Sequence, residues 1–90
     1  MTVYWTDEAL EQVSAISDLL AVTSPLYAER VVTNLFDRVR TLADHPKLGP
    51  VYRKAGLPQV RELLVKPYRV VYYVGRKQLE IIAVLHQRQR

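Results

Sequence analysis

Two residues with chemically useful side chains stand in the C-terminal part of the chain, in segments that otherwise favour strands. Arg69 interrupts the β-branched and aromatic run from Tyr68 to Val74, and His86 follows an apolar run. An arginine in so hydrophobic a strand has two explanations. It pairs with a carboxylate, Glu62 or Glu80, or it anchors a phosphate or carboxylate on an open face of the sheet. Histidine is the side chain best suited to proton transfer near neutral pH.

The relation between Arg69 and His86 depends on how the last two strands pair. A two-residue loop at Arg76 and Lys77 predicts these pairs: Tyr73 with Glu80, Val71 with Ile82 and Arg69 with Val84. Arg69 and His86 are then diagonal neighbours on one face. A neighbouring cation makes a histidine less basic and can tune it for proton transfer. A one-residue slip would remove this proximity, and His86 would then be only a polar strand end.

Further cationic and aromatic residues extend this candidate surface. In the same register Tyr73 faces away from the core, where it could stack on a base or simply pack across the strands. Arg88 and Arg90 fit either a binding surface or a solvated tail, and Arg53 and Lys54 could line the same side. The candidate target-binding residues are therefore Arg61, Arg69, Tyr73, His86, Arg88 and Arg90.

Composition narrows the chemistry further. The chain has no cysteine and only two histidines, so we expect no metal site and no cofactor. Its formal net charge of +4 and pI of about 9.6 favour an anionic partner, such as nucleic acid, a nucleoprotein or an acidic protein, although solubility alone also accounts for a mildly basic chain. Residues 1–8 do not resemble a secretory signal, and the apolar runs are too short to span a bilayer. We therefore expect a cytoplasmic protein with no membrane partner.

The elements that must position these residues form one domain, residues 1–90. A short strand at Val3–Trp5 precedes a helix from Asp7 to Leu20, capped by Thr6. A second helix, capped by Ser24 with Pro25 in its first turn, ends near Asp44. An exposed loop over 46–58 then leads to strands at 60–65, 68–74 and 79–85. The sequence thus predicts an α+β fold: an N-terminal strand, a helical hairpin and a three-stranded antiparallel sheet.

Taken together in order, several short segments resemble the RelE/ParE toxin superfamily of type II toxin–antitoxin systems over essentially the whole chain. The segments that carry this resemblance are Trp5–Leu10, Ser24–Pro25, Leu42–Gly49, Leu57–Leu63, Pro67–Tyr72 and Val84–Arg88. The resemblance implies the same fold and a cognate antitoxin that binds along apolar grooves of the toxin as a hetero-oligomer.

Two activities follow from the resemblance, and the ParE-like one is favoured. ParE-like members inhibit DNA gyrase, which fits the stretch Val60–Leu63 and the ending Val84–Arg88. RelE-like members cleave mRNA on the ribosome as endoribonucleases, in which case Arg69, His86 and Arg61 would be catalytic. The lack of any tyrosine after Tyr73 weakens the RelE-like alternative. A third alternative is an inactive homologue that serves only as an antitoxin partner.

Overall fold

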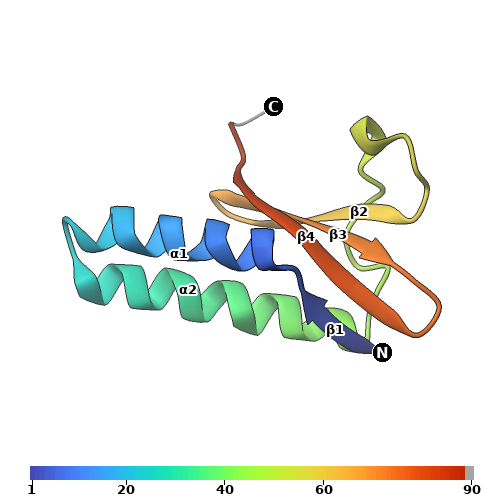
Figure 1. Ribbon diagram of the computed structural model, residues 1–90, viewed down its shortest axis with the longest axis horizontal. Coiled ribbons are helices and arrows are strands. Elements are labelled where there is room, and N and C mark those ends of the chain that lie inside the picture. The colour runs from blue at the N-terminus through green and yellow to red at the C-terminus, as the bar shows by residue number, and fades with distance from the viewer. Residues whose placement is uncertain (89–90) are drawn as a thin grey trace.

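The computed structural model describes residues 1–88 as a helical hairpin packed against one face of a four-stranded sheet (Figure 1). The α-helices and strands are β1 (Thr2–Trp5), α1 (Asp7–Ala21), α2 (Pro25–Arg40), β2 (Val60–Val65), β3 (Tyr68–Val74) and β4 (Gln78–His86). Two 3-10 turns, η1 (Thr41–Ala43) and η2 (Arg53–Ala55), lie between α2 and β2. The α+β prediction is confirmed. Neither α1 nor α2, the α-helices among residues 1–88, has the length and hydropathy of a membrane-spanning helix.

Both helices begin at the caps that the sequence predicts. The Thr6 hydroxyl accepts the amide of Ala9 at 3.2 Å, and the Ser24 hydroxyl accepts the amide of Tyr27 at 3.1 Å. These contacts satisfy amides that have no partner within their own helix. Thr6 also donates its hydroxyl proton to the carbonyl of Ile81 at 2.7 Å. The start of α1 is therefore attached directly to β4.

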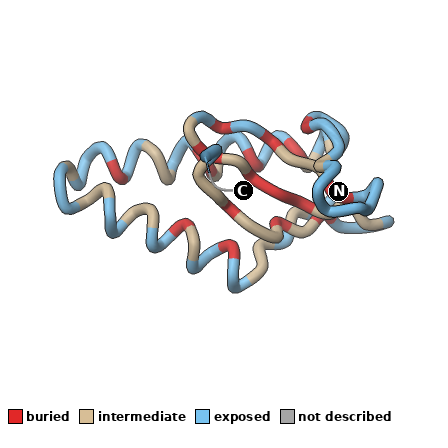
Figure 2. Tube along the Cα trace, turned by 90° about the horizontal axis from the view of Figure 1, so that it is seen from above, coloured by how far each residue is buried: buried red, intermediate tan, exposed pale blue. Residues whose placement is uncertain are grey.

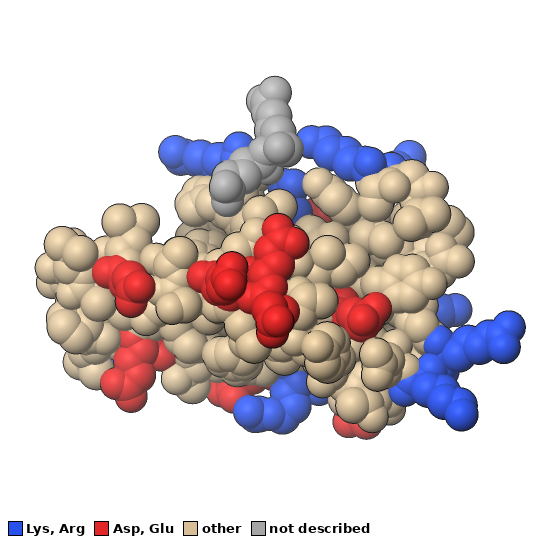
Figure 3. Space-filling view, in the orientation of Figure 1, with Lys and Arg blue, Asp and Glu red and all other residues tan. Residues whose placement is uncertain are grey.

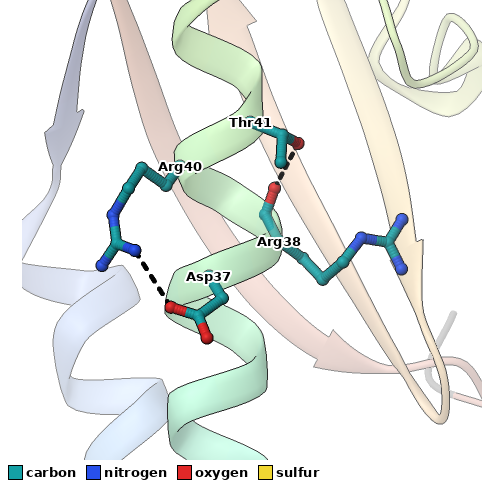
Figure 4. A network of polar contacts seen from close by, with 4 residues as sticks. All are labelled: Asp37, Arg38, Arg40 and Thr41. Atoms are coloured by element: carbon teal, nitrogen blue, oxygen red, sulfur yellow. Dashed lines mark hydrogen bonds and ion pairs between the residues drawn. The ribbon is translucent and has the colours of Figure 1, made fainter.

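The C-terminal end of α2 comes earlier than the sequence predicts. The helix stops at Arg40 and continues as the single turn η1, where the Thr41 hydroxyl donates to the carbonyl of Arg38 at 2.6 Å (Figure 4). Arg40 forms an exposed ion pair with Asp37 at 3.0 Å, and Arg38 extends from the opposite side of the helix. A 3-10 turn of this kind is common at a helix end because it satisfies the last free carbonyls.

The sheet has the order β1-β4-β3-β2 and is mixed. β1 joins β4 in parallel as an edge strand, whereas β2, β3 and β4 are antiparallel as predicted. β1 ends at Trp5, which pairs with Ile81, so the backbone groups of β4 beyond Ile81 have no neighbouring strand on that edge. Gln12 of α1 supplies a partner for one of them, because its side-chain oxygen accepts the amide of Val84 at 2.7 Å.

The core lies between the helical hairpin and the sheet. Leu35 of α2 and Tyr72, Leu79 and Ile81 of the sheet have no exposed surface, and Figure 2 shows the buried positions gathered where the two layers meet. At one end of this core the rings of Trp5 and Phe36 pack at 4.7 Å. Burial of these side chains is the main force that holds the layers together.

A β-bulge changes the register of the last hairpin. Tyr73 pairs with Glu80 as predicted, but the register shifts between Val71 and Tyr72. Val71 then pairs with Ala83 and Arg69 with Leu85, one residue beyond the predicted partners. Val84 becomes the buried residue at this end of β4, and the predicted pairing of Val71 with Ile82 is wrong. A one-residue shift exchanges the two faces of a strand, so the side chains that follow the bulge change sides.

The segment 48–52 is also more ordered than an exposed loop. It runs along the outer edge of β2, where the amide of Glu62 donates to the carbonyl of Pro50 at 2.9 Å and the amide of Tyr52 donates to the carbonyl of Val60 at 2.8 Å. Val51 forms an isolated bridge with Arg61. These contacts cover the edge of β2 and position the residues that follow.

Candidate functional site

Arg69 lies on the face of the sheet away from the helices, among polar neighbours. Its Nε lies 3.2 Å from Oε1 of Glu62, and its Nη2 donates to the carbonyl of Gln87 at 3.0 Å. The Nε–Glu62 contact is an ion pair whose geometry does not align as a hydrogen bond. The guanidinium carbon lies 6.0 Å from the ring centre of Tyr52. Of the two carboxylates considered from the sequence, Glu62 is the partner of Arg69.

Arg69 and Glu62 separate two adjoining depressions on this face. One, of about 440 Å³, is lined by Pro50, Glu62, Leu64, Arg69, Gln87 and Arg88. The other, of about 320 Å³, is lined by Val51, Tyr52, Arg53, Lys54, Glu62 and Arg69. We call the two together the cationic hollow. The expectation that Arg53 and Lys54 line the same side as Arg69 is confirmed.

His86 lies on the opposite side of the sheet from Arg69. It pairs with Tyr68, and the two rings meet edge to face at 5.8 Å. With Gln12 and Ile16 of α1 and Tyr68, His86 lines an apolar depression of about 290 Å³ on the helix side. The amide of Arg88 donates to its Nδ1 at 3.2 Å. The predicted proximity of Arg69 and His86 is therefore wrong, because the bulge turns the end of β4 over.

Arg61 points in a third direction. Its Nη1 donates to the carbonyl of Gly49 at 2.8 Å and more weakly to that of Lys47 at 3.4 Å. The amide of Gly49 in turn donates to the hydroxyl of Tyr72 at 2.9 Å. Arg61 thus holds the segment 47–49 against the edge of β2. Its contacts are those of a structural residue.

The remaining predicted residues are dispersed. Tyr73 is on the same face as Arg69 but four residues along β3, roughly 13 Å away at the usual rise of a strand. Arg88 lines the cationic hollow, whereas Arg90 lies outside the described residues. The sequence did not single out Tyr52, whose ring lies beside Arg69. The one feature of the sequence that could have pointed to Tyr52 as a site residue is its position between Pro50 and the basic pair Arg53–Lys54.

The buried tyrosine hydroxyls have altered acidity. Burial raises the pKa of Tyr72 above its ordinary value, and the amide of Gly49 and the charge of Arg61 partly oppose this effect. Burial also raises the pKa of Tyr68, and the nearby Tyr27 adds to the shift. The Tyr72 hydroxyl accepts the amide of Gly49, and the Tyr68 ring packs edge to face against His86. Residues 1–88 contain no cluster of acidic or histidine side chains able to hold a metal ion.

Comparison with known proteins places this geometry in a family. Residues 3–90 match the family described as ParE toxin of type II toxin-antitoxin system, parDE. The chain belongs to the ParE toxin family. The predicted resemblance to the RelE/ParE superfamily is thereby confirmed, and the chain is a toxin of the type II toxin–antitoxin class.

Relatives of this ParE-family chain match it over nearly their full length. Toxin RelE2 of Caulobacter vibrioides is 34% identical over 85 residues, which cover 93% of this chain and 92% of the relative. Putative toxin Y4kP of Sinorhizobium fredii is 32% identical over 88 residues, covering 96% and 88%. The structure titled Chromosomal ParDE TA system from P. aeruginosa aligns with a TM-score of 0.81 at 27% identity, over 96% and 95% of the two chains.

Proposed function

We propose that this chain arrests growth by inhibiting DNA gyrase and that a cognate antitoxin neutralises it. The supporting observation is the separation of the three side chains that RNA cleavage was expected to use. Arg69 lies on the open face of the sheet, His86 lies on the helix face, and Arg61 is bound to the segment 47–49. Acid–base catalysis requires its groups within hydrogen-bonding reach of one substrate. This set does not meet that requirement, and a toxin that acts by binding needs no such set.

Gyrase inhibition is tested by titrating the purified chain into a supercoiling reaction with relaxed plasmid, gyrase and ATP. We expect supercoiling to fall as the toxin concentration rises. A heat-unfolded sample serves as the control for non-specific effects of a basic protein. Unchanged supercoiling in the presence of folded toxin would contradict the proposal.

One observation favours the RelE-like alternative, a ribosome-dependent endoribonuclease. Glu62 and Arg69 lie side by side between Lys54 and Arg88, so a carboxylate that could act as a base stands next to a cation that could hold a phosphate. On this alternative Glu62→Gln and Arg69→Gln would each abolish cleavage of mRNA on translating ribosomes. Primer extension on such mRNA distinguishes the two functions, because a gyrase inhibitor leaves the message intact.

The antitoxin would cover the apolar surface around the helical hairpin. Leu19 and Val22 at its tip are 73% and 85% exposed, and Leu26 and Tyr27 on α2 are more than half exposed. The apolar depression beside His86 continues this surface towards the sheet. Exposed apolar area of this kind marks a binding surface in a soluble chain. Leu19→Glu is expected to weaken capture of the antitoxin in co-expression while the toxin itself stays folded.

A further inference from the structure

Charge is segregated between two parts of this molecule. All 13 lysines and arginines follow residue 29 in the sequence, whereas the carboxylates of Asp7, Glu8, Glu11 and Asp18 lie on α1. Figure 3 shows acidic side chains gathered over α1, and basic ones along the rim near η2 and the end of β4 and, separately, at the β3–β4 hairpin. The overall charge of +4 therefore understates how basic that rim is.

The cationic hollow lies at this basic rim and has the chemistry of a phosphate site. Arg53 and Lys54 are exposed on η2, Arg88 follows β4, and Arg69 forms the floor between them. Arg69 is held from two sides, by Glu62 and by the carbonyl of Gln87, so its position is fixed before any ligand arrives. Among the described residues that line the hollow, Glu62 is the sole carboxylate. Clustered arginine and lysine around a fixed guanidinium suit the repeated phosphates of a nucleic acid.

The side chains that line the hollow favour a duplex over a single strand. Proteins that bind single-stranded nucleic acid stack its bases on exposed aromatic rings. In the described part of the chain, Tyr52 is the sole aromatic residue that lines the cationic hollow, and its ring faces the guanidinium of Arg69. Among residues 1–88 the hollow offers no second ring on which successive bases could stack. Contacts limited to the backbone are those that a protein makes with duplex phosphates.

We propose that the cationic hollow binds the sugar–phosphate backbone of double-stranded DNA, so that the toxin contacts DNA at its target as well as protein. This goes beyond the proposed function, since gyrase can be inhibited through protein contacts alone. Glu62 limits the affinity, because a phosphate that approaches Arg69 competes with the carboxylate 3.2 Å from its Nε. Arg53, Lys54 and Arg88 draw the backbone in, and Arg69 fixes its position.

The test is fluorescence anisotropy of a labelled 20-base-pair DNA of mixed sequence, titrated with the purified full chain between 50 and 200 mM salt. The variants are Lys54→Glu, within the hollow, and Lys77→Glu, in the β3–β4 hairpin at the far end of β4. Both lysines are exposed, and both changes alter the net charge equally. Glu62→Gln removes the competing carboxylate. Urea midpoints of the variants are measured alongside to show that each one folds.

We expect binding in the range of non-specific complexes, with a Kd on the order of 10⁻⁵ M at low salt that weakens roughly 100-fold over the salt range if three to four phosphates are contacted. Lys54→Glu should bind roughly tenfold more weakly at 50 mM salt, with a salt slope smaller by about 1, whereas Lys77→Glu should bind like the parent chain. Glu62→Gln should bind several-fold more tightly.

Three results would overturn the proposal: no binding at 50 mM salt, equal losses in Lys54→Glu and Lys77→Glu, or tighter binding of a 20-nucleotide single-stranded RNA than of the duplex. The outcome is independent of the gyrase titration. If the parent chain inhibits gyrase but the two lysine variants bind DNA equally, this inference fails and the proposed function stands. If the lysine variants differ but gyrase is unaffected, the DNA site stands and the proposed function fails.

Discussion

Gly49 is the position where a single methyl group should do most damage to this fold. A Cβ at Gly49 would overlap the carbonyl oxygen of Glu62, lie 2.7 Å from its carbonyl carbon and lie 3.0 Å from the hydroxyl of Tyr72. The first two are backbone atoms of β2, which cannot rotate away. Gly49→Ala must therefore push the segment 48–51 off the edge of β2.

The cost follows from the hydrogen bonds that this movement breaks. They are the bonds from the Gly49 amide to Tyr72, from Arg61 to the Gly49 carbonyl and from the Glu62 amide to Pro50. At about 1 kcal/mol each, with a further 1 kcal/mol or more for a buried phenol left without its partner, the loss is about 3–5 kcal/mol. That is a large part of the roughly 5–15 kcal/mol available to a small domain.

Gly56→Ala provides a matched control. Gly56 has a φ of 73°, so alanine is strained there, but nothing lies within 4 Å of its Cβ position. The expected loss is about 1–2 kcal/mol, from backbone strain alone. Urea denaturation followed by circular dichroism at 25 °C measures both variants. A Gly49→Ala variant that lost no more stability than Gly56→Ala would rule out this steric clash.

Three further changes test the packing and the caps. Tyr72→Phe should lose about 1–3 kcal/mol. Because burial raises the pKa of Tyr72, its neutral form stabilises the fold fully below pH 10, and this contribution is lost as the pH rises through the higher folded value. In urea titrations from pH 8 to 11, the free energy of unfolding should therefore fall less steeply with pH in Tyr72→Phe than in the parent chain. Part of the fall that remains is due to Tyr68, whose pKa is also raised. Leu35→Ala, at a fully buried site, should lose about 2–5 kcal/mol in the same assay. Thr6→Ala should lose about 1–2 kcal/mol, since it removes both the cap of α1 and the bond to Ile81.

The sequence predicted the elements of this fold well because their signals are local. The caps at Thr6 and Ser24 and the alternation in β2 and β3 depend on neighbouring residues, and the bounds of both strands match the prediction. The early end of α2 at Arg40 was missed, because Leu42 and Ala43 continue the apolar pattern through η1.

The site was predicted less well because it depends on long-range contacts. The run Ile81–Leu85 is apolar throughout, so either register buries apolar side chains and the pattern cannot reveal the bulge. The bond from Val84 to Gln12 supports the shifted register and joins residues 72 positions apart. The pairing of segment 48–52 with β2 also depends on contacts between distant residues, and its Gly49 and Pro50 are typical of a loop. The Arg69–Glu62 pair could be predicted from the sequence, because the two residues lie on adjacent strands.

The most direct test of the account is the search for covalent gyrase–DNA complexes in a reaction that contains the folded toxin, gyrase and supercoiled plasmid. Detergent and protease treatment releases the trapped DNA, which is then resolved on a gel. We predict that linear plasmid accumulates with toxin concentration, as it would for a toxin that stabilises gyrase on cleaved DNA. Plasmid that stays supercoiled, together with mRNA cleaved on ribosomes by the same preparation, would contradict the account and indicate an endoribonuclease.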